Sequence, residues 1–185
     1  MKIKGWIILV VILALLVIVG ISSYNNMVSL NSTVDESWAQ VENQLQRRYD
    51  LIPNLVETAK GYMKFEQETL IAVTKARASV GQAQSIDEKI AANNQLEGAL
   101  ARLLVVFENY PDLKANENFV TLMAELSGTE NRIAVERQRY NQKVKEYNIY
   151  IKKFPNVILS SIFGFKERPY FKAASEASEA PKVQF

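Results

Sequence analysis

Residues 45–62 read LQRRYDLIPNLVETAKGY, and they place Arg47, Arg48 and Asp50 side by side within an apolar, helix-like run. Guanidinium and carboxylate groups this close in a helical protein can pin two helices through a buried ion pair. They can equally bind an anionic headgroup or the carboxylate of a partner. A catalytic pair of carboxylates is the third possibility, but no two acids stand in a recognisable catalytic motif. The stretch therefore indicates a structural or binding role.

Composition removes most other chemistry. The 185 residues include no histidine and no cysteine, so imidazole catalysis, thiolate nucleophiles, His/Cys zinc sites and disulfides are excluded. A di-iron bundle of the Glu-x-x-His type is excluded for the same reason. No GxGxxG, Walker A or GxSxG motif is present. We expect no cofactor, no metal and no enzymatic activity.

Charge is almost balanced, with 22 basic and 20 acidic residues. Two of the basic residues, Lys2 and Lys4, precede the first apolar run, and the rest of the chain is neutral. A nucleic-acid-binding protein would show a basic face or stripe, so a nucleic-acid partner is not expected.

The N-terminal run GWIILVVILALLVIVGI, residues 5–21, carries no charge. As a helix it spans roughly 25 Å, which is at the short end of the range for a membrane helix. Trp6 and Tyr24 stand at its two ends, as interfacial aromatic anchors do. We expect residues 1–23 to be a transmembrane anchor. The alternative is a cleaved signal peptide, because Gly20-Ile21-Ser22 is an acceptable cleavage site.

The charges on either side of this run predict its orientation. Lys2 and Lys4 lie before it, whereas the first basic residue after it is Arg47. Cytoplasmic flanks carry the excess of lysine and arginine. We therefore expect a cytoplasmic N-terminus and a domain on the extracytoplasmic side of the cell membrane.

The remaining pattern is helical, with apolar residues three and four apart and no alternation typical of strands. We predict an all-α fold: the anchor, then an antiparallel up-and-down four-helix bundle over residues 24–172. Its helices are expected at 25–49, 51–80, 85–109 and 116–154. Ser85 and Glu88 form a capping box, and Asn116 is expected to cap the last helix. The aromatic stripe of the last helix is expected in the core rather than at a cofactor: Phe119, Tyr140, Tyr147 and Phe154.

Pro53 raises a question about the first two helices. Proline is tolerated in the first turn of a helix, and Asp50 is a good N-cap. We predict that one helix ends near Tyr49 and the next begins near Asp50. The alternative is one long helix kinked at Pro53, because the apolar phase nearly continues through it.

The C-terminal run VILSSIFGF, residues 157–165, is apolar. We expect it to close the end of the bundle. Alternatively it enters the lipid interface, with Lys152, Lys153 and Lys166 at the headgroups. The membrane-interface candidates are then Trp6, Tyr24, Lys152, Lys153, Ile158, Ile162, Phe163 and Phe165. Residues 173–185 are small and polar and are predicted to form a flexible tail.

Several motifs in chain order resemble those of the bacterial LemA family. They are RRYDLIPNLV (47–56), GY (61–62), AR (76–77), YPDLKANENF (110–119), TEN (129–131), RQRYN (137–141), YN (147–148), FP (154–155) and FGF…YF (163–171). The resemblance covers nearly the whole chain. It implies a single-pass membrane protein with a four-helix bundle and no established enzymatic activity. Some relatives take part in building specialised membrane compartments.

The charged residues that recur in the family pattern are the candidate ion cluster: Arg47, Arg48, Asp50, Arg77, Glu130 and Arg137. One arginine of the first stretch is expected to reach Glu130 or Glu136. For function we expect a membrane-anchored, non-enzymatic scaffold or regulator whose partner is another membrane or envelope protein, with no small-molecule substrate. The alternatives are a lipid-interacting or membrane-shaping module and an enzyme of unknown class that uses Asp or Glu.

Overall fold

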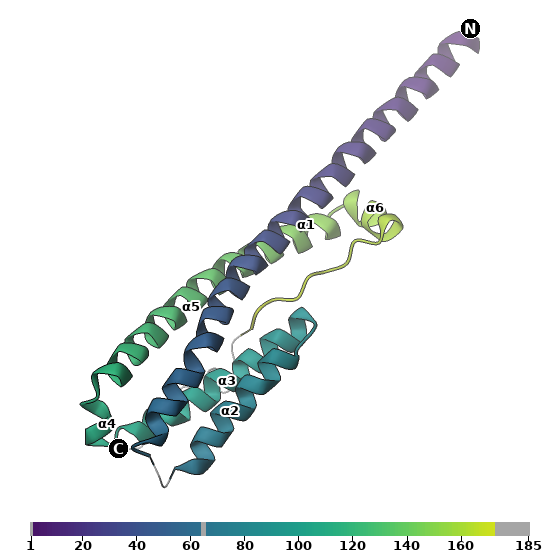
Figure 1. The fold of residues 1–185 in the computed structure, drawn as a ribbon. Helices are drawn as coiled ribbons and strands as arrows, with labels where there is room; N and C mark the ends of the chain where they lie inside the picture. The colour runs from purple at the N-terminus through teal and green to yellow at the C-terminus, as the bar shows by residue number, and fades with distance from the viewer. Residues whose placement is uncertain (1, 64–65, 173–185) are drawn as a thin grey trace, which may run out of the picture. The chain divides into compact units, whose positions relative to one another are not determined.

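The computed structural model describes residues 2–63 and 66–172. They form helices joined by short connections, without a strand in these two ranges (Figure 1). The helices are α1 (Lys2–Lys60), α2 (Gln67–Gln82), α3 (Ile86–Phe107), α4 (Pro111–Lys114), α5 (Glu117–Lys152) and α6 (Asn156–Phe163). The all-α prediction is therefore confirmed. The predicted tail, residues 173–185, lies outside the described residues.

The chain divides into two compact units, and both α1 and α5 contribute to each of them. The first unit combines Met1–Ala39 with Arg139–Tyr170, and the second combines Gln40–Gln138 with Phe171–Phe185. The first unit thus holds the apolar N-terminal run and α6, whereas the second holds α2, α3 and α4.

In the second unit the predicted helix break at Asp50 is wrong. Helix α1 continues through Pro53 to Lys60, and the chain turns afterwards, at Gly61 and Tyr62. Asp50 is not an N-cap; its carboxylate accepts a hydrogen bond from Gln46, one turn earlier, at 2.8 Å. The apolar phase decides the outcome, because one face of the continuous helix buries Leu45, Ile52, Leu55, Val56 and Ala59. A break at Asp50 would put these residues out of register with each other.

Local capping explains where α3 and α5 begin. The Ser85 hydroxyl accepts from the Glu88 N–H, and the Glu88 carboxylate accepts from the Ser85 N–H, so the predicted capping box is confirmed. The Asn116 side chain accepts from the Phe119 N–H at 2.9 Å, which confirms the cap of α5. The predicted helix 51–80 is replaced by the end of α1, a turn and α2. Gly61 lies in that turn.

The core of the second unit is built from the facing sides of α1, α2, α3 and α5. Phe119 and Leu103 are 1% exposed and Leu113 of α4 is fully buried. Side chains of this size each contribute about 1.5–3 kcal/mol when they leave water. Burial of these side chains stabilises the packing of the helices against one another.

In the first unit, the end of α5 packs on the part of α1 that follows the apolar run. Tyr140 and Val144 are fully buried, and Tyr147 is 1% exposed. The rings of Trp38 and Tyr140 meet edge to face, with centroids 5.2 Å apart. Phe119, Tyr140 and Tyr147 are thus core residues as predicted. Phe154 is not: it lies after the end of α5 and is 82% exposed.

The N-terminal run has the surface expected of a membrane span. In the described part of the chain, α1 is the one helix that is long and apolar enough to cross a bilayer. Its large apolar side chains from Trp6 to Val19 are exposed, and none of this segment is buried by the protein.

Candidate functional site

Arg48 is the best-defined polar centre of the second unit. Its side chain is 1% exposed, which is unusual for an arginine. One terminal nitrogen donates to the Glu130 carboxylate of α5 at 2.7 Å, and the other donates to Asn93 Oδ1 of α3 at 2.8 Å. A single side chain therefore links α1, α3 and α5. Of the two acids expected for such an arginine, Glu130 is the one that it meets.

Asn93 belongs to this centre although the sequence reading missed it. It is 2% exposed, and its amide donates to the Lys89 carbonyl while its oxygen accepts from Arg48. Its place in the sequence contained a signal. Asn93 lies in phase with Ile90 and Leu96 on the apolar face of α3, where a polar residue needs a buried partner.

Arg77 and Tyr49 explain how α1 tolerates Pro53. A proline lacks the N–H that would bind the carbonyl four residues earlier, here the carbonyl of Tyr49. The Nε of Arg77 on α2 donates to that carbonyl at 3.1 Å. Its guanidinium also lies 3.8 Å from the centre of the Tyr49 ring. The side chain of α2 thus replaces the hydrogen bond that proline removes from α1.

The six charged candidates do not form one cluster. Arg48 and Glu130 are paired, whereas Arg47 lies on the surface, 4.0 Å from Glu125 with both side chains about half exposed. Asp50 is exposed and bound to Gln46. Arg137 lies over the ring of Phe171, 5.6 Å from its centre. Only Arg48, Glu130 and the missed Asn93 come together, and their geometry is that of a structural pin.

Polar side chains of α5 perform a similar task in the first unit. Residues 165–170 follow α6 as an extended strap. Tyr147 donates to the Lys166 carbonyl at 2.9 Å, and Tyr140 donates to the Pro169 carbonyl at 2.8 Å. Asn148 both donates to the Arg168 carbonyl and accepts from its N–H, each at 2.9 Å. Burial raises the pKa of Tyr147, so the phenol stays protonated and keeps donating.

The membrane-interface candidates lie in the same unit, around α6. The ring of Tyr24 contacts Phe163 and Phe165, with centroids 4.9 and 5.8 Å away. Ile158 and Ile162 are 53% and 69% exposed. The run 157–165 therefore does not close the bundle as expected. The reason is that Asn156 and Ser160, rather than the isoleucines, occupy the inner side of α6.

The other interface candidates are exposed. Trp6 is 70% exposed near the start of α1. Lys152 and Lys153 precede α6 on the surface, and Lys152 pairs with Glu167 at 2.7 Å. Lys166 follows α6 and is exposed. The cations thus bracket the apolar helix in sequence.

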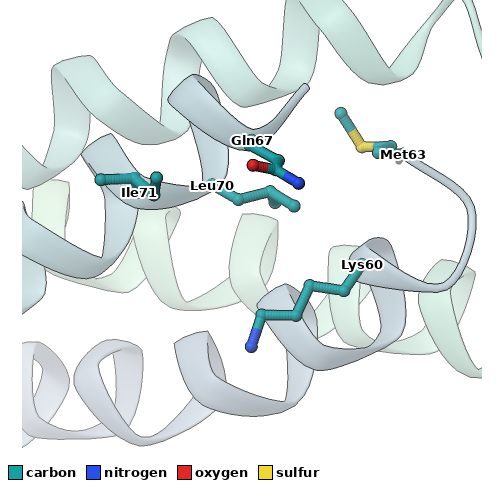
Figure 2. A pocket seen from close by; sticks show the side chains of 5 residues that line it. All are labelled: Lys60, Met63, Gln67, Leu70 and Ile71. Atoms are coloured by element: carbon teal, nitrogen blue, oxygen red, sulfur yellow. The ribbon is translucent and has the colours of Figure 1, made fainter. Parts of the chain in front are cut away.

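Three of the concave regions among the described residues of the second unit bear on its possible chemistry. The first, of about 540 Å³, lies where α1 gives way to α2 (Figure 2). It is lined by Lys60, Met63, Gln67, Leu70 and Ile71, and Lys60 is already paired with Glu57 at 3.1 Å. The described residues that line it are mainly apolar, and among them there is no set of groups for catalysis.

A second concave region is a polar surface pocket of about 350 Å³ beside Arg48's partner Asn93. It contains the ion pair between Lys89 and Glu42, and it extends to Tyr49 and Val80. Both charges in it are therefore already neutralised by each other.

The third region is a groove between α3 and α5, of about 280 Å³. Leu100, Leu104, Met123 and Leu126 make it apolar, and the acids Glu97 and Glu130 lie along it. We call it the α3–α5 groove. Within the described residues, no group of three or more acidic side chains is placed to hold a metal ion.

Comparison with known proteins adds relatives to this picture. The chain is 27% identical to magnetosome protein MamQ 2 of Paramagnetospirillum magneticum over 178 residues, 80% of this chain and 64% of that protein. It is 25% identical to magnetosome protein MamQ of Magnetospirillum gryphiswaldense, with the same coverage. Protein LemA of Metamycoplasma hominis is 24% identical over 70% of this chain and 60% of its own length. The chain thus spans less than two thirds of the length of these curated relatives.

The family comparison is more extensive. The model of the LemA family matches residues 37–185, which include the Arg48 pin, the α3–α5 groove and α6. Several of the motifs that resemble this family supply side chains that join α1 to α3 and α5, or α5 to the strap: Arg48, Glu130, Tyr140, Tyr147 and Asn148. The chain belongs to the LemA family.

Proposed function

We propose that this protein is a membrane-anchored, non-enzymatic adaptor that binds other proteins of the bacterial envelope. In this proposal the helical segments of the second unit form an antiparallel up-and-down four-helix bundle. The observation that carries it is the continuity of α1. One uninterrupted helix contains both the apolar run 5–21 and Arg48, which is pinned to α3 and α5. The apolar run and the Arg48 pin thus belong to the same helix.

The charged motif residues support a binding role over catalysis. Arg48 and Glu130 neutralise each other, and Arg77 serves the Tyr49 carbonyl. Catalytic groups are instead left poised toward a site where substrate can bind. Arg48, Glu130 and Arg77 are thus committed to the architecture, which favours binding through the surface of the bundle over catalysis by these groups.

The α3–α5 groove is the surface best suited to a protein partner. Its apolar floor matches the apolar stripe of a helix. Glu97 is half-buried beside it and makes no hydrogen bond or ion pair with another described residue. An acid in this position attracts a basic residue on the partner. We therefore assign the groove to an amphipathic helix of an envelope protein that carries lysine or arginine beside its apolar stripe.

Site-specific photo-crosslinking in intact cells tests the proposal. A photoreactive residue at Leu104, in the groove, should capture an envelope protein, and the cross-linked peptide should contain a basic amphipathic helix. The matched control is Val105, which is 72% exposed on the same helix but does not line the groove. The product from Leu104 should disappear on Glu97→Lys. Identical products from both positions, or a product that is insensitive to charge reversal, would refute the groove as the partner site.

Topology is a separate part of the proposal. The positive-inside pattern supports a bundle on the extracytoplasmic side. The chain has no cysteine, so Ser178→Cys introduces a unique thiol, at a position outside the described residues. A membrane-impermeant thiol reagent should label it in intact cells. Labelling only after permeabilisation would place the bundle in the cytoplasm and redirect the partner search there.

A further inference from the structure

Helix α6 buries polar side chains and exposes apolar ones, the opposite of a helix on the surface of a water-soluble protein. Asn156 and Ser160 point inward and are 8% and 6% exposed. Val157, Ile158 and Ile162 point outward and are 44%, 53% and 69% exposed. A surface helix normally buries its apolar stripe and hydrates its polar one. The outer face of α6 is therefore built for surroundings other than water.

This orientation is fixed by hydrogen bonds. The Asn156 amide donates to the Tyr150 carbonyl at 3.1 Å, and the Ser160 hydroxyl donates to the Ile151 carbonyl at 3.1 Å. Both acceptors belong to the last turn of α5, which would otherwise have unpaired carbonyls. Rotating α6 to bury its isoleucines would break both bonds. The exposed apolar face is thus a consequence of how α6 is attached.

The place of α6 along α1 identifies what covers this face. Tyr24, whose ring contacts Phe163 and Phe165, comes three residues after the apolar run ends at Ile21. Three helical residues correspond to about 4.5 Å. Helix α6 therefore lies beside α1 at the level where the apolar segment ends (Figure 1). In a membrane-inserted protein this level is the boundary between acyl chains and headgroups.

The flanking residues complete an interfacial pattern. Phe154, just before α6, is 82% exposed, and Lys153 beside it is also exposed. Lys166 follows the helix on the surface. Helices that lie in the membrane plane combine an apolar face with lysines that reach anionic headgroups.

We propose that α6 lies in the interface of the membrane that α1 enters, with Val157, Ile158 and Ile162 among the acyl chains. Lys153 and Lys166 then contact anionic phosphate groups of the same leaflet. The protein would thus hold the membrane at two points, a span and an interfacial helix. This inference rests on the proposed anchor, and it assigns to α6 a lipid partner rather than a protein.

Spin labels on the full-length chain test the inference. Single cysteines at Ile158 and Ile162 are labelled in protein reconstituted into vesicles of phosphatidylcholine and phosphatidylglycerol. Leu13, within the apolar run, is the lipid control, and Lys75, exposed on α2, is the aqueous control. The collision ratio of oxygen to a water-soluble nickel complex measures depth. We expect the ratios at 158 and 162 to shift from the value at 75 toward the value at 13.

The controls separate the possible failures. An aqueous ratio at 158 and 162 together with a lipid ratio at 13 would overturn the interfacial role while leaving the anchor intact. Low collision rates with both reagents at 158 and 162 would show that protein, such as a second copy of the chain, covers α6, and this also overturns the inference. An aqueous ratio at 13 would refute the anchor itself.

Discussion

Removing Arg48 tests whether the family motif is a structural pin. The chain provides its own control, because Arg47 and Arg48 are adjacent but differ in environment. The Arg48 side chain is 1% exposed and bound to two helices, whereas Arg47 and its partner Glu125 are about half exposed. Methionine is the appropriate replacement at both positions, because it preserves most of the aliphatic stem and removes the charge.

The expected costs follow from what each substitution leaves behind. Arg48→Met leaves Asn93 Oδ1 buried without its donor, while the Glu130 carboxylate, 39% exposed, can hydrate. An unsatisfied buried acceptor costs about 1–3 kcal/mol, so we expect a loss of stability in that range. Glu130→Ala instead leaves the buried guanidinium without its counter-charge. Breaking a buried pair in this way costs about 3–5 kcal/mol, and partial exposure of Glu130 favours the lower end. Arg47→Met should cost under about 1 kcal/mol.

Urea unfolding of the full-length chain in mild detergent, followed by far-ultraviolet circular dichroism, measures these costs. The double variant Arg48→Met/Glu130→Ala should cost less than the sum of the two single variants, because no buried charge remains unpaired. Equal costs for Arg47→Met and Arg48→Met would refute the buried pin. Additive costs in the double variant would show that Arg48 and Glu130 do not interact energetically.

Three further predictions address other contacts. Arg77→Met should destabilise the wild-type chain by about 1 kcal/mol but have little effect in a Pro53→Ala background, because alanine restores the N–H that Arg77 replaces; urea unfolding of the four proteins closes this cycle, and an equal cost in both backgrounds would contradict the assignment. Hydrogen bonds from the backbone N–H groups of Gln84 and Ser85 lower the pKa of Glu88. The stabilisation that its ionised carboxylate gives to the start of α3 is therefore fully present above the ordinary glutamate pKa, and it is lost as pH falls through the lowered value. Amide-exchange protection at the start of α3 should therefore fall in acid, and Glu88→Gln should flatten that dependence. Asn148→Leu should increase hydrogen exchange in the strap 165–170 with little change in α3, and unchanged exchange in the strap would show that Asn148 does not hold it.

Local chemistry explains which helix boundaries could be predicted from the sequence. The capping box at Ser85 and the cap at Asn116 depend on side chains within three residues of the helix start, so neighbouring residues specify them. The continuation of α1 past Pro53 depends on Arg77, 24 residues later in the chain, which reaches the Tyr49 carbonyl. No local rule contains that information. The sequence shows the proline, whose missing N–H favours a helix break, but it does not show the hydrogen bond from Arg77 to the Tyr49 carbonyl that compensates for it.

The polar centre shows the same limit. An arginine near an apolar face could be expected to find an acid on the last helix, and Glu130 is that acid. Asn93 could have been recognised from its place in the stripe of α3. The sequence does not predict that three other candidates lie away from this centre, namely Arg47, Asp50 and Arg137. Residues that recur in a family pattern need not contact one another in the folded protein.

Helix α6 shows why apolar character alone is a poor guide to burial. The run 157–165 could be expected in a core, since apolar side chains usually leave water. Its inner face is instead decided by Asn156 and Ser160, which supply hydrogen bonds to the carbonyls at the end of α5. In water this arrangement is unfavourable, because burying each isoleucine would stabilise the fold by about 1.5–3 kcal/mol. In contact with lipid the penalty disappears and the hydrogen bonds are retained. The polarity of α6 is therefore consistent with folding against a membrane.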